Sequence, residues 1–254
     1  MRQGLMRLVA AVAAGALLVS SSLCLSACGK YEAQGRERIE AVGETSVDEV
    51  QEAIVQSRWQ KVVDTFNSYM DDGQISRDEA NAAFEGVCFI GDSITEGLNS
   101  YEYLSSDKVV AKIGVSLQSA GEMVTQAAQL YPLYVVIAFG ENDLIADGGD
   151  SSVYVEHLDE VVQQVRAEIP SAKIYVASIM GPTDAAIAKQ PVMGNWADFN
   201  SAMESYCSAH GDVTYIDTAS TAAEHADMHE PDGMHFTGAF YAYYLAKVGS
   251  VIFS

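Results

Sequence analysis

Basic residues are scarce in this sequence. Its 254 residues include 14 lysines and arginines against 35 aspartates and glutamates, and the formal net charge at pH 7 is −21. A protein that binds nucleic acid needs a basic face to neutralise phosphates, and nothing in the sequence indicates one. We therefore expect no nucleic-acid partner and interpret the charge as a solvated acidic surface.

Long apolar runs are also few, and the clearest one lies at the N-terminus. Arg2 and Arg7 precede an apolar run from Leu8 to Val19, which is the layout of a secretory signal peptide. Serines then interrupt the run before it reaches the roughly 20 apolar residues of a membrane-spanning helix. The segment therefore predicts export rather than a transmembrane anchor.

The apolar segment ends in the letters LSAC, whose cysteine is Cys28. This ending resembles the lipobox of bacterial lipoprotein precursors, in which the cysteine is lipidated and becomes the first mature residue. The resemblance implies a signal peptide over residues 1–27 and an extracytoplasmic protein anchored to the cell membrane through Cys28. An ordinary signal peptide with an incidental cysteine is the alternative. The polar residues 28–45 are interpreted as a tether.

Cysteine is scarce as well, with four in the chain. Cys24 would leave with the signal peptide, and Cys28 would carry the lipid, so Cys88 and Cys207 remain. An exported compartment permits a disulfide, but its Cα atoms must lie within about 7 Å. Cys88 falls in a predicted central strand and Cys207 on a helix toward one edge, so we expect both thiols to be unpaired.

Residues 46–85 are predicted to form an N-terminal helical extension. Apolar residues recur at helical spacing between Ser46 and Met70. Ser46 with Glu49 also has the pattern of a capping box.

Within this extension, residues 71–79 resemble the second half of an EF-hand loop. The first and third ligand positions of such a loop would fall on Ser68 and Met70, which cannot replace acidic ligands. Calcium binding is therefore not expected. We interpret the segment as a turn followed by a second helix start, with Ser76 capping through Glu79.

Beyond the extension, short apolar runs alternate with helical patterns. The runs are continuous, as in parallel strands that are buried on both faces. They predict about five strands, at 87–90, 109–113, 133–139, 174–179 and 213–216. Helices are predicted at 150–169, at 195–209 and from about Thr237. This alternation predicts a three-layer α/β/α sandwich over residues 86–254, with its site at the carboxyl ends of the strands.

Four short segments carry candidate chemistry. GDSITEG places Ser93 at a strand-to-helix turn, and IGVS places Gly114 after the second strand. GEND places Asn142 after the third strand, and DGMH pairs Asp232 with His235 just before the last helix. Taken singly, each segment could be an ordinary turn, cap or loop. Their joint occurrence at strand ends favours a common site.

Acyl transfer requires this set of groups. A neutral serine is a poor nucleophile, so a base must take its proton. A carboxylate orients that base and fixes its tautomer. Pre-positioned N–H donors stabilise the oxyanion of the tetrahedral intermediate.

In this order, the four segments resemble the sequence blocks of the SGNH hydrolase superfamily, also called GDSL-like lipases and acylhydrolases. The resemblance covers about residues 86–254. One position departs from the pattern, because Lys112 replaces an asparagine that often precedes the glycine of the second block. The resemblance implies a flavodoxin-like α/β/α fold, no metal and no organic cofactor.

The resemblance also implies roles for the individual residues. Ser93 would be the nucleophile, His235 its base and Asp232 the acid that orients the base. The backbone N–H groups of Ser93 and Gly114 and the side chain of Asn142 would form the oxyanion hole.

The expected function is serine esterase activity through an acyl-enzyme on Ser93. The expected substrate is a short acyl ester, such as an acetyl ester, on an extracellular glycan or a small molecule. Thioesterases, lysophospholipases and acyltransferases share these blocks and stay open as alternatives. An alternative from another class is a non-catalytic surface lipoprotein that binds a ligand. The stretch around His225 and His229 has no known metal-ligand spacing and is interpreted as a polar loop.

Overall fold

The structure, a computed structural model, describes residue 57 and residues 60–254. The predicted signal peptide, Cys28, the tether and the start of the N-terminal helix lie outside the described residues. Trp59–Ser254 form one compact unit. No helix of the described part has the length and apolar character needed to cross a bilayer.

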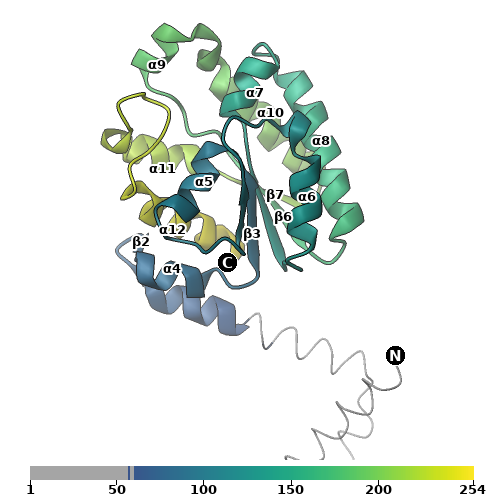
Figure 1. Cartoon of the computed structure of the whole chain (residues 1–254), viewed down its shortest axis with the longest axis vertical. Helices are drawn as coiled ribbons and strands as arrows, with labels where there is room; N and C mark the ends of the chain where they lie inside the picture. Colours follow the sequence, from purple (N-terminus) through teal and green to yellow (C-terminus); the bar gives the residue numbers. More distant parts are fainter. Residues whose placement is uncertain (1–56, 58–59) are drawn as a thin grey trace, which may run out of the picture. The chain divides into compact units, whose positions relative to one another are not determined.

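A parallel sheet of five strands lies at the centre of this unit (Figure 1). Its strand order is β4-β3-β5-β6-β7, so the chain starts inside the sheet, runs to one edge and then crosses back. The strands are β3 (Val87–Gly91), β4 (Val109–Ala111), β5 (Tyr134–Ala138), β6 (Lys173–Ala177) and β7 (Val213–Ile216). The predicted α/β fold and its strands are confirmed, with bounds that shift by a residue or two.

Helices cover both faces of the sheet (Figure 1). One face packs against α5 (Ser93–Ser100), α11 (Thr218–Glu224) and α12 (Phe240–Ile252). The other packs against α6 (Gly121–Ala128), α8 (Ser151–Glu168) and α10 (Trp196–Ala209). In β3, Phe89 packs with the first layer and Ile90 with the second. Because both faces are buried, the strands read as continuous apolar runs in the sequence.

Shorter elements connect these layers at the carboxyl ends of the strands. They are α7 (Glu141–Ala146), α9 (Asp184–Lys189) and the 3-10 helices η1 (Leu117–Ser119), η2 (Pro191–Asn195) and η3 (Ala226–Met228). The GEND segment is therefore the start of a helix and not a simple loop. The last helix begins at Phe240, after a turn in which the Phe240 N–H donates to the Thr237 carbonyl at 3.0 Å.

The N-terminal extension is only partly helical. Residues 60–69 are helical, but an antiparallel hairpin of β1 (Met70–Asp71) and β2 (Gln74–Ile75) follows before α4 (Arg77–Ala83). The turn that was predicted within residues 71–79 is the reversal of this hairpin, where Asp72 and Gly73 have φ values of 47° and 75°, whereas the two short strands beside it were not predicted. Left-handed residues of this kind reverse the chain.

The second helix of the extension begins where it was expected. Ser76 is the N-cap of α4, and its Oγ donates a hydrogen bond to Glu79 Oε2. The side chain of Ser76 makes no bond to a backbone N–H of the first turn. The predicted pairing of Ser76 with Glu79 is therefore present, in a side chain-to-side chain form.

The extension packs against the C-terminal end of α12, which is the end farther from the candidate site. The ring centroid of Phe66 lies 5.0 Å from that of Phe253 and 6.0 Å from that of Phe84. Gly249 permits this approach, because a Cβ there would lie 2.1 Å from the Phe66 ring. The extension and the sheet thus share one apolar core.

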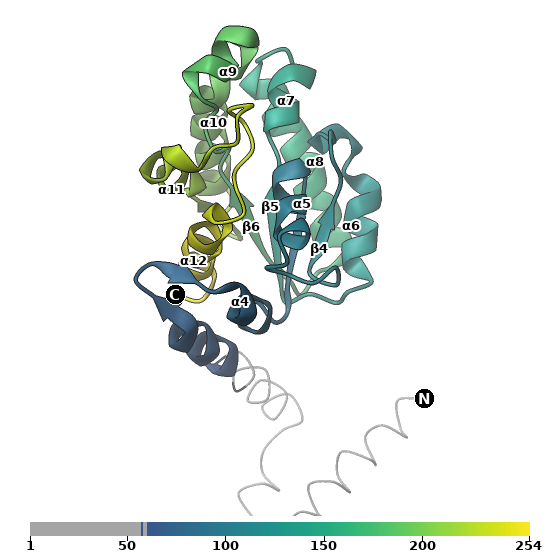
Figure 2. The ribbon, with the colours of Figure 1, turned by 60° about the vertical axis from the view of Figure 1, so that its left-hand side comes forward.

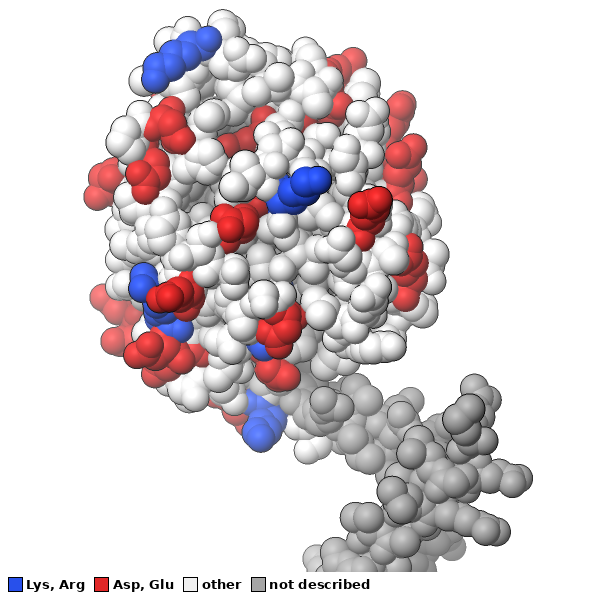
Figure 3. Space-filling view, viewed as in Figure 1, with Lys and Arg blue, Asp and Glu red and all other residues white. Residues whose placement is uncertain are grey.

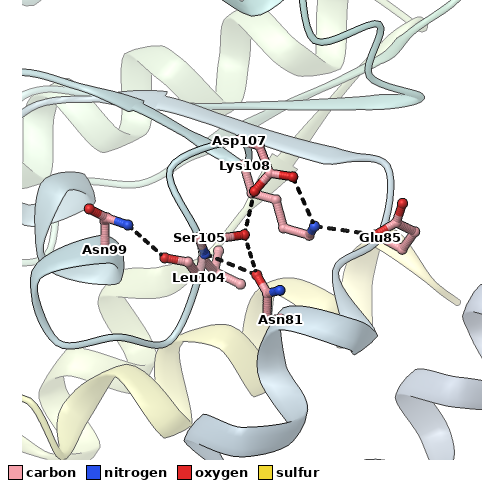
Figure 4. Close-up of polar contacts among 7 residues, drawn as sticks. All are labelled: Asn81, Glu85, Asn99, Leu104, Ser105, Asp107 and Lys108. Atoms are coloured by element: carbon pink, nitrogen blue, oxygen red, sulfur yellow. Dashed lines mark hydrogen bonds and ion pairs between the residues drawn. The ribbon is translucent and has the colours of Figure 1, made fainter.

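Polar contacts also fix α4 to the loop between α5 and β4 (Figure 4). Asn81 Oδ1 accepts hydrogen bonds from the N–H and the Oγ of Ser105, at 2.9 and 2.7 Å. The buried Lys108 reaches Glu85 at 3.2 Å. These contacts hold α4 beside the amino end of β3, away from the carboxyl ends of the strands.

Candidate active site

The first candidate segment forms a tight turn from β3 into α5. Gly91 has no room for a side chain, since a Cβ would meet Thr95 Oγ1 at 2.0 Å and the Ala138 carbonyl at 2.4 Å. Asp92 caps the helix by accepting a hydrogen bond from the Ile94 N–H at 3.0 Å. Ser93 is the first residue of α5 and lies at the carboxyl end of the sheet, where open α/β sheets bind their ligands.

The structure brings Ser93, His235 and Asp232 together from distant parts of the chain. Ser93 Oγ lies 2.8 Å from His235 Nε2. The other ring nitrogen, Nδ1, lies 2.6 Å from Asp232 Oδ2. Both distances are those of hydrogen bonds, so a continuous chain links a hydroxyl, an imidazole and a carboxylate. This is the geometry expected of a nucleophile, its base and an orienting acid.

The loop before α12 holds the imidazole in place. Asp232 Oδ1 accepts hydrogen bonds from the backbone N–H groups of Met234 and His235, at 2.9 and 3.0 Å. Gly233, between Asp232 and Met234, has a φ of 78°, and a Cβ there would meet Thr183 Oγ1 at 2.1 Å. The Glu230 N–H also donates to the His235 carbonyl at 2.7 Å. The histidine is therefore fixed through its backbone as well as its ring.

These contacts keep Asp232 ionised. Its partial burial acts to raise the pKa, but the hydrogen bonds from Met234 and His235 outweigh that effect and hold the pKa at about 2. The side chains of His235 and Asp232 are 37% and 43% exposed. The site is therefore open to solvent. It lies at the carboxyl ends of the strands, and Figure 2 shows α7 and α9 at the same end of the sheet.

The predicted oxyanion donors lie on neighbouring strands. Ser93 follows β3, Gly114 follows β4 and Asn142 follows β5, and β3 pairs with both other strands. The Ser93 N–H opens a helix and so has no intrahelical acceptor. Gly114 has a φ of 74°, a left-handed conformation that favours glycine. Among the described residues, no acceptor binds its N–H.

Asn142 is joined to the serine turn through a residue that the sequence did not single out. Its Nδ2 atom donates to Asp92 Oδ2 at 3.4 Å, a long hydrogen bond. Asp92 is buried, and burial raises its pKa to about 6, although hydrogen bonds from Ile94 and Asn142 and the nearby His235 lower it. Asp92 therefore links the candidate nucleophile's helix to the candidate oxyanion donor.

Two further buried acids lie on α7, next to Asn142 in sequence. Asp143 Oδ1 accepts a hydrogen bond from the Leu117 N–H at 2.8 Å and so ties the loop after β4 to α7. Burial raises the pKa of Asp143 to about 7. Glu141 is also buried, and its pKa is raised well above the usual range. The only sequence signal for these acids was their place inside the GEND block, because burial depends on the whole fold.

The other candidate residues lie apart from this site. Cys88 and Cys207 are free, buried thiols, as expected, and burial raises the pKa of each to about 12. His225 stacks on Tyr243 and His229 packs on Phe236, with ring centroids 3.7 and 4.2 Å apart. No group of acidic, histidine and cysteine side chains in the described ranges is arranged to hold a metal ion.

Three solved structures with the same fold are described as a lipase/acylhydrolase, an O-acetyltransferase domain and a carbohydrate esterase. A lipase/acylhydrolase from Enterococcus faecalis is 19% identical with a TM-score of 0.54, and covers 66% of this chain and 94% of its own. The catalytic domain of a Streptococcus pneumoniae peptidoglycan O-acetyltransferase is 20% identical with a TM-score of 0.51, and the match covers 66% of this chain and 92% of that domain. A carbohydrate esterase of Talaromyces cellulolyticus is 16% identical with a TM-score of 0.52, and the match covers 65% of this chain and 95% of the esterase. At these identities the likeness establishes the fold alone.

The sequence comparison goes further. No curated protein matches the chain significantly. The profile of the GDSL-like lipase/acylhydrolase family, however, matches residues 89–243. This range is more than half of the chain, and it includes Ser93, Asn142, Asp232 and His235. The chain belongs to the GDSL-like lipase/acylhydrolase family.

Proposed function

We propose that this protein is a serine esterase that removes a short acyl group, such as acetyl, from an extracellular glycan or a small molecule. The observation that carries this proposal is the continuous contact from Ser93 Oγ through the His235 ring to Asp232. A ligand-binding protein without catalysis would have no need of a base in contact with the hydroxyl.

The reaction would proceed in two halves. Ser93 Oγ attacks the ester carbonyl while His235 Nε2 takes the hydroxyl proton, and the same proton then passes to the departing alcohol. This leaves an acyl-enzyme on Ser93. Water then attacks the acyl carbon, His235 takes the proton from water and returns it to Ser93 Oγ, and the acid leaves. Asp232 stays ionised throughout and stabilises the imidazolium.

The oxyanion of each tetrahedral intermediate would be bound by the N–H groups of Ser93 and Gly114 and by the Asn142 amide. One Asn142 N–H is directed at Asp92, which leaves the other for the oxyanion. Donors that are already in place need no rearrangement during the reaction.

Four observations support this choice of substrate, a short acyl group on a large, polar alcohol. The cavity beside Asp92, at the base of the site, measures about 20 Å³, so a long acyl chain would have to lie outside it. The exposed triad leaves the alcohol side open to a polymer. Acidic side chains are also spread over the face drawn in Figure 3, which disfavours a polyanionic substrate. Two enzymes of similar fold are described as acting on peptidoglycan and on carbohydrate.

The proposal is tested with p-nitrophenyl esters of increasing acyl length. We expect acetyl to be the preferred acyl group, with kcat/KM lower by at least about 10-fold for octanoyl. A rise of kcat/KM with chain length would indicate a lipase or thioesterase instead. No hydrolysis of any ester by the folded protein would favour the non-catalytic alternative.

Asn142→Ala should lower kcat by about 10²–10³-fold, because one oxyanion donor is lost while the backbone donors remain. KM should change little, since the donor acts mainly in the transition state. Steady-state kinetics on the acetyl ester measures both values. Asn99→Ala is the matched control, because Asn99 only bonds the Leu104 carbonyl at the other end of α5. Equal kcat values for the two variants would contradict the oxyanion role.

We also propose that the protein is a lipoprotein of the outer face of a bacterial cell membrane. This rests on the signal-peptide pattern and on the lipobox-like sequence that ends at Cys28. The described extension joins the domain at the amino end of β3, whereas the site lies at the carboxyl ends of the strands. A tether attached there would direct the site away from the membrane, toward soluble or polymeric substrates.

Expression in a bacterial host should give a membrane-associated protein whose first residue is a lipidated Cys28. Mass spectrometry of the N-terminal peptide identifies the modification. Cys28→Ser should prevent it, whereas Cys24→Ser, inside the predicted signal peptide, should leave the mature protein unchanged. A mature N-terminus elsewhere, with an unmodified Cys28, would contradict the lipoprotein proposal.

A further inference from the structure

A buried acid with no part in the reaction above lies at the base of the site. Glu141 is the first residue of α7, precedes Asn142 in the chain and is 8% exposed. Its Oε1 atom is buried and has no hydrogen-bond partner among the described residues. An unpaired carboxyl oxygen in a protein interior is costly, above all when the group is charged. The position therefore favours the neutral acid.

Glu141 lines the cavity of about 20 Å³ together with Asp92, Thr95, Ser178 and Tyr244, among other residues. A water molecule needs roughly 10–15 Å³ of such space, so this cavity fits about one. The candidate hydrogen-bond partners of Glu141 Oε1 are thus a water in this cavity and the polar groups that line it.

Titratable groups surround Glu141 on several sides. Asp92 comes from the start of α5, Asp232 from the loop before α12 and Tyr244 from α12 itself. Burial is the main cause of the raised pKa of Glu141, and the negative charges of Asp92 and Asp232 add to it. On α7, Asp143 is already engaged by a backbone N–H of the β4–α6 loop. Two carboxyl groups that share a small cavity cannot both be charged without a penalty.

Asp92 is the better placed of the two to carry the charge. It accepts hydrogen bonds from the Ile94 N–H and from Asn142 Nδ2, and it lies in the field of His235. By contrast, no group among the described residues donates a hydrogen bond to Glu141 Oε1. The proton that the pair holds near neutral pH therefore belongs on Glu141.

We propose that Glu141, in its protonated form, is a positioning residue for Asn142. Its acid proton forms a hydrogen bond to Asp92 through the one-water cavity, and Asp92 in turn orients the Asn142 amide toward the oxyanion. Ionisation of Glu141 places a second negative charge beside Asp92 and close to the forming oxyanion. The loss of the acid's hydrogen bond and the added negative charge both raise the barrier of each acyl-transfer step. The inference rests on the proposed ester hydrolysis.

The test compares pH profiles of kcat for the wild type, Glu141→Gln and Glu141→Met. Glutamine is neutral at every pH and keeps a donor, so its kcat should stay level at alkaline pH, where that of the wild type falls by about 10-fold or more. Methionine has a similar size but no donor, so its kcat should be lower by about 10–10²-fold at every pH, with KM little changed. Circular dichroism confirms that each variant is folded.

Glu122→Gln is the matched control, because Glu122 also lies in the first turn of a helix but is exposed. Its profile should follow that of the wild type. The same alkaline loss in Glu141→Gln as in the wild type, or wild-type kcat in Glu141→Met, would overturn the proposal.

A second readout does not depend on activity. The infrared spectrum at neutral pH should contain a protonated carboxylic acid component, beside that of Asp143 with its pKa of about 7, that Glu141→Gln removes and Glu122→Gln keeps. Its absence from the wild type would overturn the role of Glu141 while leaving ester hydrolysis intact. Failure of the wild type to hydrolyse esters would instead contradict the proposed function, so the two failures are distinguishable.

Discussion

Ser93→Ala is expected to lower turnover of an acetyl ester by about 10⁶-fold, leaving only the residual catalysis that comes from the oxyanion hole and substrate binding. The hydroxyl supplies the attacking oxygen, and no other group in the site replaces it. The fold should be unaffected, because Ser93 Oγ bonds only to His235, whereas Asp92 caps the helix. The measurement is kcat/KM of wild type and variant, with circular dichroism to confirm folding.

Ser100→Ala is the matched control for this substitution. Ser100 ends the same helix, is exposed, and donates only to Glu96 at 2.7 Å. The control should keep wild-type turnover. A folded Ser93→Ala variant with the same turnover as Ser100→Ala would mean that the nucleophile lies elsewhere.

His235→Ala should be nearly as damaging, with a loss of about 10⁵–10⁶-fold. Without the imidazole no group takes the serine proton, and the departing alcohol receives none. Because the two residues act as one unit, Ser93→Ala combined with His235→Ala should be no slower than either single variant. A purely additive loss in the double variant would contradict a shared role.

Two further measurements separate catalysis from structure for this histidine. Added imidazole should restore part of the activity of His235→Ala, since a free base can enter an exposed site. His210→Ala is the control, because the His210 ring bonds the Tyr206 carbonyl and packs on the Tyr206 ring at the end of α10. It should keep wild-type turnover, and a matching loss in both variants would indicate a general effect on the fold.

The sheet could be predicted from the sequence because both of its faces are buried. Continuous apolar runs such as 133–139 then indicate buried strands, and the long helix predicted at 150–169 has a clear apolar stripe. The hairpin at residues 70–75 could not be predicted in this way. Its strands have two residues each, too short for a periodic pattern, and it depends on a left-handed Asp72.

In the candidate site, too, some residues could be identified from the sequence and others only from the structure. Ser93, Asp232 and His235 could be picked out because each sits in a short block at a strand or helix boundary, and the structure brings their side chains into contact. Asp92 and Glu141 belong to the same blocks but were not assigned a role. What distinguishes them is burial and a shared cavity, which arise only when distant elements pack together.

The most direct test of the account is covalent labelling with a fluorophosphonate, which reacts only with a serine activated as a nucleophile. Peptide mass spectrometry after labelling of the wild type should locate the adduct on Ser93. Ser93→Ala should take up no label, and His235→Ala should react far more slowly. A folded wild-type protein that stays unlabelled, or an adduct on a different serine, would contradict the assignment of Ser93 as the nucleophile.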